Sequence, residues 1–312
     1  MGMPNFIVAG TQKAATTWLH ECLNEHPEVF VPKVKEMHFY CKEPCPKSKN
    51  HMGVDWYISQ FPDDKSFKAI GEISVDYMYY DYIAEDIYKF NPNMKILFIL
   101  RNPVDRAYSA FWMNKRYKAN MPNFTEFVKS DNQFILRGMY YTQIKRYLKF
   151  FRRDSLKILI YDDLVSHPAR FICEVYDFLH VSKDFTPSSL NKSVAATKSL
   201  NPVIGFLFYK YVALVVNKVP LALSLWRFLK HNTPLSKLYL YRNHRLPPYP
   251  QINEKDRAIL TNLYKEENNK LFALLNRNIP EWEENLKGHY PFKDCSCIFY
   301  EKDLEAEYLN GD

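Results

Sequence analysis

Lys13 and the adjacent threonines Thr16 and Thr17 lie among small residues between positions 10 and 18, where an apolar run gives way to a helical pattern. Small residues let the backbone approach an anion closely, lysine supplies a positive charge, and threonine supplies hydroxyl donors. The start of a helix adds backbone N–H groups and the positive end of the helix dipole. The segment therefore predicts a phosphate cradle made of Gln12, Lys13, Ala14, Ala15, Thr16, Thr17 and Trp18.

The spacing in this segment excludes two better-known phosphate loops. A Walker A loop needs a second glycine and then a lysine where Ala15 and Thr16 stand. A dinucleotide fingerprint needs three glycines, and of these Gly10 alone is present. Because any strand-turn-helix can carry lysine and threonine, a nucleotide kinase or a non-catalytic nucleotide-binding module stays open as an alternative.

A second candidate anion site follows the apolar run Lys95–Leu100. This run is apolar without alternation, which is typical of a central parallel strand covered on both faces. Arg101 would emerge at the carboxyl end of that strand, where open α/β sheets bind ligands. Asn102 and Pro103 can cap and open a helix, and Ser109 would lie inside it. A guanidinium at this position suits a phosphate.

The two segments together resemble the sulfotransferases that use 3'-phosphoadenosine 5'-phosphosulfate (PAPS) as donor. Residues 10–18 are similar to the family's 5'-phosphosulfate motif, and residues 101–109 look like its 3'-phosphate motif. The resemblance implies that Arg101 and Ser109 hold the 3'-phosphate and that adenosine 3',5'-bisphosphate (PAP) is the product. Lys198 and Ser199 look like the family's later loop over the nucleotide, which often carries arginine where this lysine stands.

The catalytic groups are expected on two segments. Sulfuryl transfer needs a base that takes the proton of the acceptor. It also needs a positive charge beside the leaving phosphate oxygen, which becomes negative, and Lys13 is the candidate for this second role. Lys33–Tyr40 resembles the Lys-Glu-x-His-Phe-Phe segment of glycan sulfotransferases and their bacterial relatives, which implies that Glu36 is the base. His38 is the competitor, because the ordinary pKa of histidine is nearer neutrality. Without the resemblance, the simpler interpretation of Glu36 is an ion pair with Lys33 or Lys35 on a solvated loop, with no catalytic role.

The acceptor is indicated less directly. Gly71–Tyr77 is similar to the Glu-Lys-Thr-Pro-Ser-Tyr pattern of the same relatives, but Ile73 stands where glycan-modifying members often have an active-site lysine. Glu72 and Asp76 are candidate acceptor-binding residues, since they would add negative charge there; Asp76 could instead cap a helix near Asp81. We therefore expect a small-molecule acceptor such as a charged natural product, sulfated on a hydroxyl or amine, with a glycan or glycolipid as the alternative.

Cysteine usage predicts no metal site. Six cysteines in a chain of this length form no dense disulfide framework, so buried or free thiols in a reducing compartment are expected. His38, Cys41 and Cys45 lie close enough in sequence to suggest a metal corner. Cys295 and Cys297, however, are separated by a single residue, fewer than the usual two to about four of a zinc pair. We expect no metal.

The elements that must position these residues follow an α/β pattern. Apolar runs alternate with helical patterns as far as about residue 187, which is typical of βαβ units and a parallel sheet. We expect strands at Phe6–Ala9, Lys95–Leu100 and Leu156–Tyr161, and helices capped by Thr16 or Thr17, near Met139–Phe151, from Pro168, and near Glu254–Leu275. The predicted fold is a P-loop-like central parallel sheet flanked by helices with a helical C-terminal cover, in one domain with a core of about 5–282 and a tail at 283–312.

Composition and hydropathy restrict the kinds of partner and the cellular location that we expect for this chain. A surplus of seven positive charges without a dense basic block favours anionic ligands and gives no reason to expect nucleic acid. The first apolar run is too short for a signal peptide, so a cytoplasmic location is expected. The apolar zone Val203–Leu229 is broken by three basic residues, which predicts packed amphipathic helices or a lid and no membrane span. The sequence indicates no oligomeric state.

Overall fold

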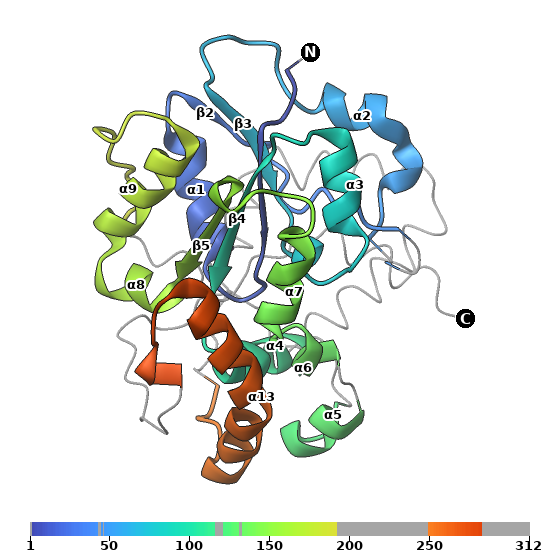
Figure 1. The fold of residues 1–312 in the computed structure, drawn as a ribbon, viewed down its shortest axis with the longest axis vertical. Helices are drawn as coiled ribbons and strands as arrows, with labels where there is room; N and C mark the ends of the chain where they lie inside the picture. The colour runs from blue at the N-terminus through green and yellow to red at the C-terminus, as the bar shows by residue number, and fades with distance from the viewer. Residues whose placement is uncertain are drawn as a thin grey trace, which may run out of the picture.

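A five-stranded parallel sheet forms the centre of the molecule (Figure 1). The structure, a computed structural model, describes residues 2–42, 45, 47–115, 121–130, 133–191 and 249–282. The strands are β1 (Phe6–Gly10), β2 (Val29–Phe30), β3 (Ala69–Ile73), β4 (Lys95–Leu100) and β5 (Leu156–Ile160), in the order β2-β3-β1-β4-β5. Every pairing is parallel, which requires crossover connections and confirms the predicted α/β fold.

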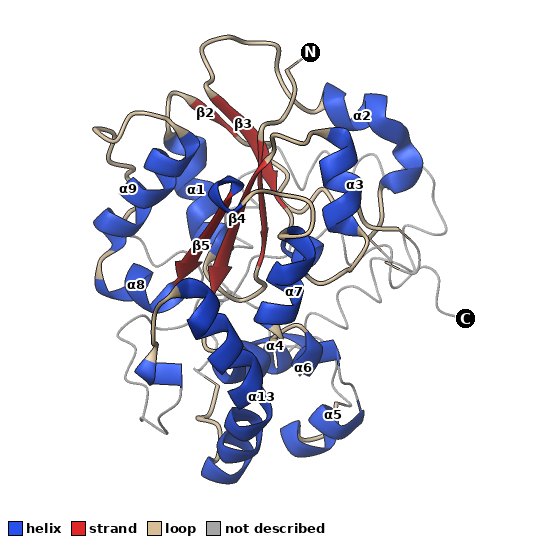
Figure 2. Cartoon of the chain, viewed as in Figure 1, coloured by secondary structure: helices blue, strands red, loops and turns tan. Residues whose placement is uncertain are grey.

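Helices connect the strands and cover both faces of the sheet (Figure 2). The described α-helices are α1 (Thr16–Glu25), α2 (Gly53–Ser59), α3 (Ile83–Phe90), α4 (Pro103–Lys115), α5 (Phe124–Ser130), α6 (Gln133–Leu136), α7 (Tyr140–Tyr147), α8 (Tyr161–Ser166), α9 (Pro168–Leu179) and α13 (Glu254–Leu275). Short 3-10 helices are η1 (Asn50–Met52), η2 (Val75–Met78), η3 (Arg153–Ser155) and η4 (Pro280–Trp282).

The alternation of side chains along β1 divides the core into two layers. Phe6 and Val8 are buried with residues of α1, α8 and α9, whereas Ile7 and Ala9 are buried with residues of α2, α3, α7 and α13. Both faces are therefore apolar, which explains why the strands read as continuous apolar runs and confirms the prediction for β4.

Two glycines let backbone and side chains approach closely around β1. A Cβ added at Gly71 of β3 would lie 2.1 Å from the carbonyl oxygen of Phe6. One added at Gly10 would lie 2.8 Å from the Cβ of Met78 in η2. Any larger residue at Gly71 would have to move a strand of the sheet, since the nearest atom belongs to the backbone.

The helix starts follow the sequence at α4 but not at α1. Asn102 caps α4, because its Oδ1 accepts a hydrogen bond from Val104 N at 2.9 Å. The expectation that Thr16 or Thr17 caps α1 is wrong: the cap position is Ala15, in a left-handed conformation, and no side chain caps this helix. Thr16 is already helical, so its hydroxyl cannot serve as the cap.

The C-terminal helix packs into the same core as the sheet. Phe272 of α13 and Trp282 of η4 belong to the apolar layer that includes Ile7 and Ile96. Trp282 is buried, and its Nε1 donates a hydrogen bond to Asp162 Oδ2 at 3.1 Å. The predicted helix Glu254–Leu275 is confirmed to the residue.

Several expectations lie outside the described residues, including those for 203–229 and for the tail 283–312. Within the part of the chain that the structure describes, none of the helices has the length and apolar character that a membrane crossing requires.

Trp282→Ala is expected to lower the free energy of unfolding by about 3–5 kcal/mol, because it leaves a large cavity beneath α13. Urea denaturation followed by circular dichroism measures this loss. Ile259→Ala is the matched control on α13: its side chain is 48% exposed, so a change within about 0.5 kcal/mol is expected. If Trp282→Ala left the free energy of unfolding unchanged, residues 254–282 would unfold independently of the sheet.

Candidate active site

Three neighbouring strands, β3, β1 and β4, end at the same edge of the sheet. The predicted phosphate loop follows β1, η2 follows β3, and Arg101 follows β4. Glu36 N donates a hydrogen bond to Ile73 O at 2.9 Å, which places the predicted base at the end of β3. Because ligands of open α/β sheets bind at the carboxyl ends of the strands, this edge is the candidate site.

The loop of residues 10–18 has the features of an anion site. Lys13 and Ala15 have positive φ values of 71° and 59°, and α1 begins with no acidic residue in its first turn. Within the described part of the chain, Thr16 Oγ1 and Thr17 Oγ1 are buried and have no hydrogen-bond partner. Buried polar atoms are usually paired, so these two hydroxyls at a helix start fit a phosphate ligand.

Arg101 connects the two predicted phosphate segments. Its Nη1 donates a hydrogen bond to the carbonyl oxygen of Lys13 at 3.1 Å. Its guanidinium lies 4.9 Å from the centre of the Tyr161 ring, and Tyr140 donates a hydrogen bond to its carbonyl oxygen at 2.8 Å. The structure thus brings together two segments that are 88 residues apart in sequence.

Helix α4 lies beside the same loop. Lys13 is buried, and its Nζ is 3.7 Å from Met113 Sδ on α4. Ser109, also buried, is one helical turn before Met113 and therefore on the same side of α4. Trp18 donates from Nε1 to Leu190 O at 3.2 Å. Of the other predicted cofactor residues, Ala14 and Ala15 are buried, Gln12 is half-buried, and Lys198 and Ser199 lie outside the described residues.

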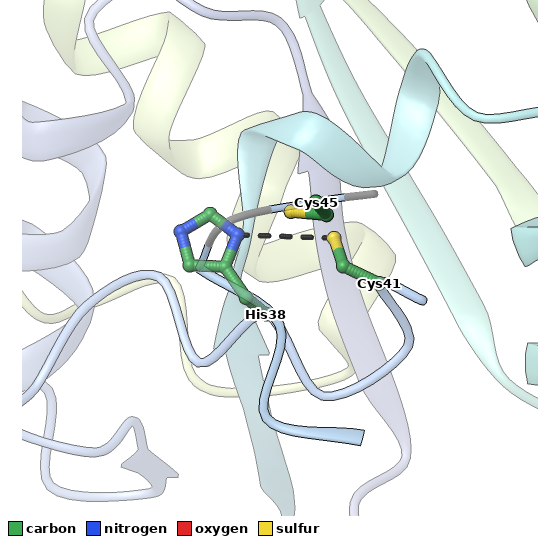
Figure 3. A group of neighbouring side chains, drawn as sticks. All are labelled: His38, Cys41 and Cys45. Atoms are coloured by element: carbon green, nitrogen blue, oxygen red, sulfur yellow. Dashed lines mark hydrogen bonds between the residues drawn. The ribbon is translucent and has the colours of Figure 1, made fainter. Parts of the chain in front are cut away.

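On the acceptor side, residues 36–42 and 47–49 form turns and irregular segments beside the end of β3. Glu36 and His38 have positive φ values of 65° and 51°, a conformation that few non-glycine residues adopt. The His38 carbonyl oxygen accepts hydrogen bonds from Cys41 N and Lys49 N, both at 3.2 Å. Figure 3 shows the result: the His38 ring, Cys41 and Cys45 point toward one another.

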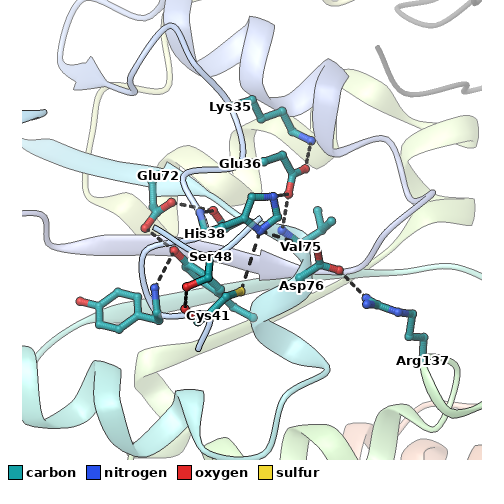
Figure 4. Close-up of polar contacts among 12 residues, drawn as sticks. Lys35, Glu36, His38, Cys41, Ser48, Glu72, Val75, Asp76 and Arg137 are labelled. Carbon is teal, nitrogen blue, oxygen red and sulfur yellow. Dashed lines mark hydrogen bonds and ion pairs between the residues drawn. The ribbon is translucent and has the colours of Figure 1, made fainter. Parts of the chain in front are cut away.

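The Glu36 carboxylate is oriented by three neighbours (Figure 4). Lys35 Nζ lies 2.6 Å from Oε1, and Val75 N donates to Oε2 at 3.1 Å. His38 Nε2 lies 4.0 Å from the same Oε2. The Glu36 side chain is 21% exposed, whereas that of His38 is 4% exposed, so Glu36 is the more accessible of the two candidate bases.

Asp76 pairs with an arginine that the sequence did not single out. Arg137, which follows α6 and lies 61 residues away in sequence, donates to Asp76 Oδ1, while Oδ2 lies 3.7 Å from His38 Nδ1. Burial alone would raise the pKa of Asp76, but attraction to Arg137 and His38 outweighs burial, and the pKa is lowered. The capping alternative for Asp76 is wrong, since α3 starts at Ile83 without a side-chain cap.

Glu72 lies among core side chains. Its carboxylate accepts hydrogen bonds from Tyr57 Oη at 2.9 Å, Tyr77 Oη at 3.1 Å and Ser74 Oγ at 2.7 Å. Burial raises the pKa of Glu72 despite these three donors. A predicted role in acceptor binding stays a prediction, and the contacts show that this carboxylate faces inward.

No spacing in the sequence marks Arg137, Tyr57 or the tyrosine at position 140 as members of this edge. Each reaches it from a helix or turn far along the chain, and arginines and tyrosines are common in this sequence. Only the packing of α2, α6 and α7 around the sheet brings them to the site.

Comparison with known proteins identifies the family. The family model described as "Sulfotransferase domain" matches residues 3–203. The mouse bifunctional heparan sulfate N-deacetylase/N-sulfotransferase 4 is 26% identical over 90% of this chain and 31% of its own length. The mouse heparan sulfate glucosamine 3-O-sulfotransferase 5 is 30% identical over 57% of this chain and 54% of its own length. The chain therefore spans 31% and 54% of the length of these two curated relatives.

A solved structure supports the fold. The sulfotransferase from Alicyclobacillus acidocaldarius superposes with a TM-score of 0.66 and 24% identity, and the match covers 91% of this chain and 100% of that one. The family match spans both phosphate segments and identifies a sulfotransferase domain, which argues against the nucleotide-kinase alternative. On this evidence the chain belongs to the family of PAPS-dependent sulfotransferases.

Proposed function

We propose that this chain transfers the sulfuryl group of PAPS to a hydroxyl or amine of a glycan and releases PAP. The contact between Arg101 Nη1 and the Lys13 carbonyl, at 3.1 Å, is the observation that carries the proposal. Because this contact joins the two predicted phosphate segments, it supports the presence of two neighbouring anion subsites at one edge of the sheet. A nucleotide with both 3'- and 5'-phosphates requires two such subsites.

Each donor-side residue has a distinct task. The first turn of α1, with the hydroxyls of Thr16 and Thr17, would bind the 5'-phosphosulfate. Arg101 and Ser109 would hold the 3'-phosphate. Lys13 would stabilise the negative charge that develops on the phosphate oxygen as the bond from that oxygen to sulfur breaks.

Glu36 is the proposed base. It would take the proton from the acceptor while the acceptor oxygen or nitrogen bonds to sulfur. The Lys35 and Val75 contacts use one lone-pair direction on each carboxylate oxygen, so capacity to accept a further hydrogen bond remains. His38 is more buried and faces Asp76 with Nδ1, which suits a supporting role.

The glycan class is supported by the two heparan sulfate relatives and by the charges near Glu36. The small-molecule expectation depended in part on Glu72 and Asp76 adding negative charge there. Glu72 is buried beneath three hydroxyl donors, and Asp76 is paired with Arg137. The acceptor side therefore presents less negative charge than the sequence suggested, which suits an anionic polymer better.

A small-molecule acceptor is the second candidate, and Ile73 favours it. This residue is buried at the end of β3 and brings no charge where glycan-modifying relatives often have lysine.

The acceptor class is tested with radiolabelled PAPS and two sets of acceptors. One set holds heparan-type glycans with unsubstituted amino and hydroxyl groups, and the other holds small hydroxyl- and amine-bearing molecules. We expect transfer to at least one glycan and none to the small molecules, measured as label in the separated product. Transfer confined to small molecules would establish the second candidate.

Arg101→Ala should weaken PAP binding by about 1.5–3 kcal/mol, the range for a hydrogen bond to a charged group. Isothermal titration with PAP and with adenosine 5'-monophosphate, which lacks the 3'-phosphate, measures the loss. Only PAP should lose affinity if Arg101 holds the 3'-phosphate. An equal loss for both nucleotides would instead show that Arg101 acts by supporting the Lys13 loop.

Glu36→Gln should lower turnover roughly 100-fold or more with PAP affinity nearly unchanged, because the amide cannot accept the acceptor proton. Single-turnover assays with labelled PAPS measure it. Glu85→Gln is the control, since Glu85 is exposed on α3 and pairs with Lys89. Turnover that survives Glu36→Gln but collapses in His38→Ala would move the base to His38.

A further inference from the structure

Three metal-ligating side chains converge next to the proposed base. The ligand atoms of His38, Cys41 and Cys45 all lie within 4.8 Å of one another, and all three side chains are buried (Figure 3). The sequence raised this group but led us to expect no metal. The sulfuryl transfer proposed above uses neither the Cys41 nor the Cys45 thiol, so it does not explain why these thiols lie beside His38.

The separations suit a tetrahedral ion. Zinc binds thiolates at about 2.3 Å and imidazole nitrogen at about 2.0–2.1 Å, which puts neighbouring ligands roughly 3.6–3.8 Å apart. His38 Nδ1 lies 3.8 Å from Cys41 Sγ. The order His-x2-Cys-x3-Cys also has the short intervals common in zinc sites. Small adjustments of the side chains would complete the geometry.

Backbone hydrogen bonds hold the ligands in place. Cys41 N donates to His38 O at 3.2 Å, Cys45 N donates to Lys42 O at 3.0 Å, and Ser48 N donates to Cys45 O at 3.0 Å. His38 N is anchored to Ser74 Oγ at the end of β3, at 3.3 Å. The three side chains are thus presented by consecutive turns that are tied to the sheet.

The surroundings of His38 resemble those of a metal ligand. With Nδ1 turned toward Cys41, Nε2 faces Glu36 Oε2 at 4.0 Å, an ion-pair separation longer than a hydrogen bond. Metal-bound histidines usually donate their other ring N–H to a carboxylate, which fixes the tautomer. Asp76 Oδ2 faces the same nitrogen as Cys41, 3.7 Å from Nδ1, while Arg137 occupies Oδ1. A movement of Asp76 toward the two thiols, or a water molecule, would supply the fourth ligand.

We propose that His38 Nδ1, Cys41 Sγ and Cys45 Sγ bind a zinc ion, with Asp76 or water as the fourth ligand, and that this ion orients Glu36 through His38. Two sulfur ligands with one imidazole favour zinc over the hard cations magnesium and calcium. Zinc binding does not depend on the proposed function, whereas the link to Glu36 rests on the role proposed for that carboxylate.

Metal content of the full chain tests the site. After expression with added zinc and purification in reductant, mass spectrometry of the metals should find about one zinc per chain, and Cys41→Ser and Cys45→Ser should lose nearly all of it. Cys173→Ser is the matched control, a free cysteine on α9 far from this group in the sequence. A second control, Cys295→Ser with Cys297→Ser, should also keep the metal.

Three outcomes would overturn the site: no zinc in the native chain, zinc retained by both Cys41 and Cys45 variants, or zinc lost with Cys295 and Cys297. If the serine variants fail to fold, cobalt substitution of the native chain decides instead. Tetrahedral cobalt with thiolate ligands has intense visible and thiolate-to-cobalt bands, and octahedral spectra without them would exclude the site.

The proposed orientation of Glu36 by zinc is tested separately, by measuring turnover after zinc is removed. Removing zinc with a chelator should lower turnover about 10–100-fold, as loss of an orienting contact does, with PAP affinity unchanged. In Glu36→Gln the chelator should cause no further loss. A chelator effect of equal size in both proteins would show that zinc supports the fold and does not act through Glu36, while the metal analysis would stand.

Discussion

Parallel pairing of β1 with β3 and β4 is the constraint on which the site depends. Phe6 pairs with Gly71 on one side and Lys95 on the other, so the three strands end at one edge and the segments that follow them meet there. The pairing tolerates little change at Gly71, where a Cβ would meet the β1 backbone. The apolar layers on both faces fix the register, because a slip of one residue would exchange the two faces.

At this edge, local conformations that cost energy occur where an anion is expected. The loop between β1 and α1 holds Lys13 and Ala15 at positive φ and leaves the hydroxyls of Thr16 and Thr17 buried without partners in the described part of the chain. A side-chain cap on α1 would have satisfied the helix start and closed it to a ligand. Arg101 then joins this loop to the end of β4, so the two predicted anion subsites depend on each other.

The acceptor side is a continuous series of polar contacts. Arg137 holds Asp76, Asp76 faces one nitrogen of His38, and the other nitrogen faces Glu36, which Lys35 holds on its far side (Figure 4). Such a series would couple the orientation of the proposed base, Glu36, to the state of His38. It also explains why charge counted from the sequence overstated the unpaired negative charge near Glu36, since Glu36 and Asp76 have ion-pair partners and Glu72 is buried.

The sequence by itself determined the strands β1, β4 and β5, the helix capped by Asn102, the helix Glu254–Leu275 and the order of the two phosphate segments, because each depends on apolar runs and capping residues that act locally. It did not mark β2 or β3 as strands. Only the tertiary structure decided that the buried hydroxyls of Thr16 and Thr17 have no hydrogen-bond partner among the described residues, that Glu72 faces the core, and that Arg137 pairs with Asp76. It also placed Cys45 beside His38 and Cys41. These outcomes arise from contacts between residues that are distant in sequence or separated by turns, and no local pattern encodes how such segments pack.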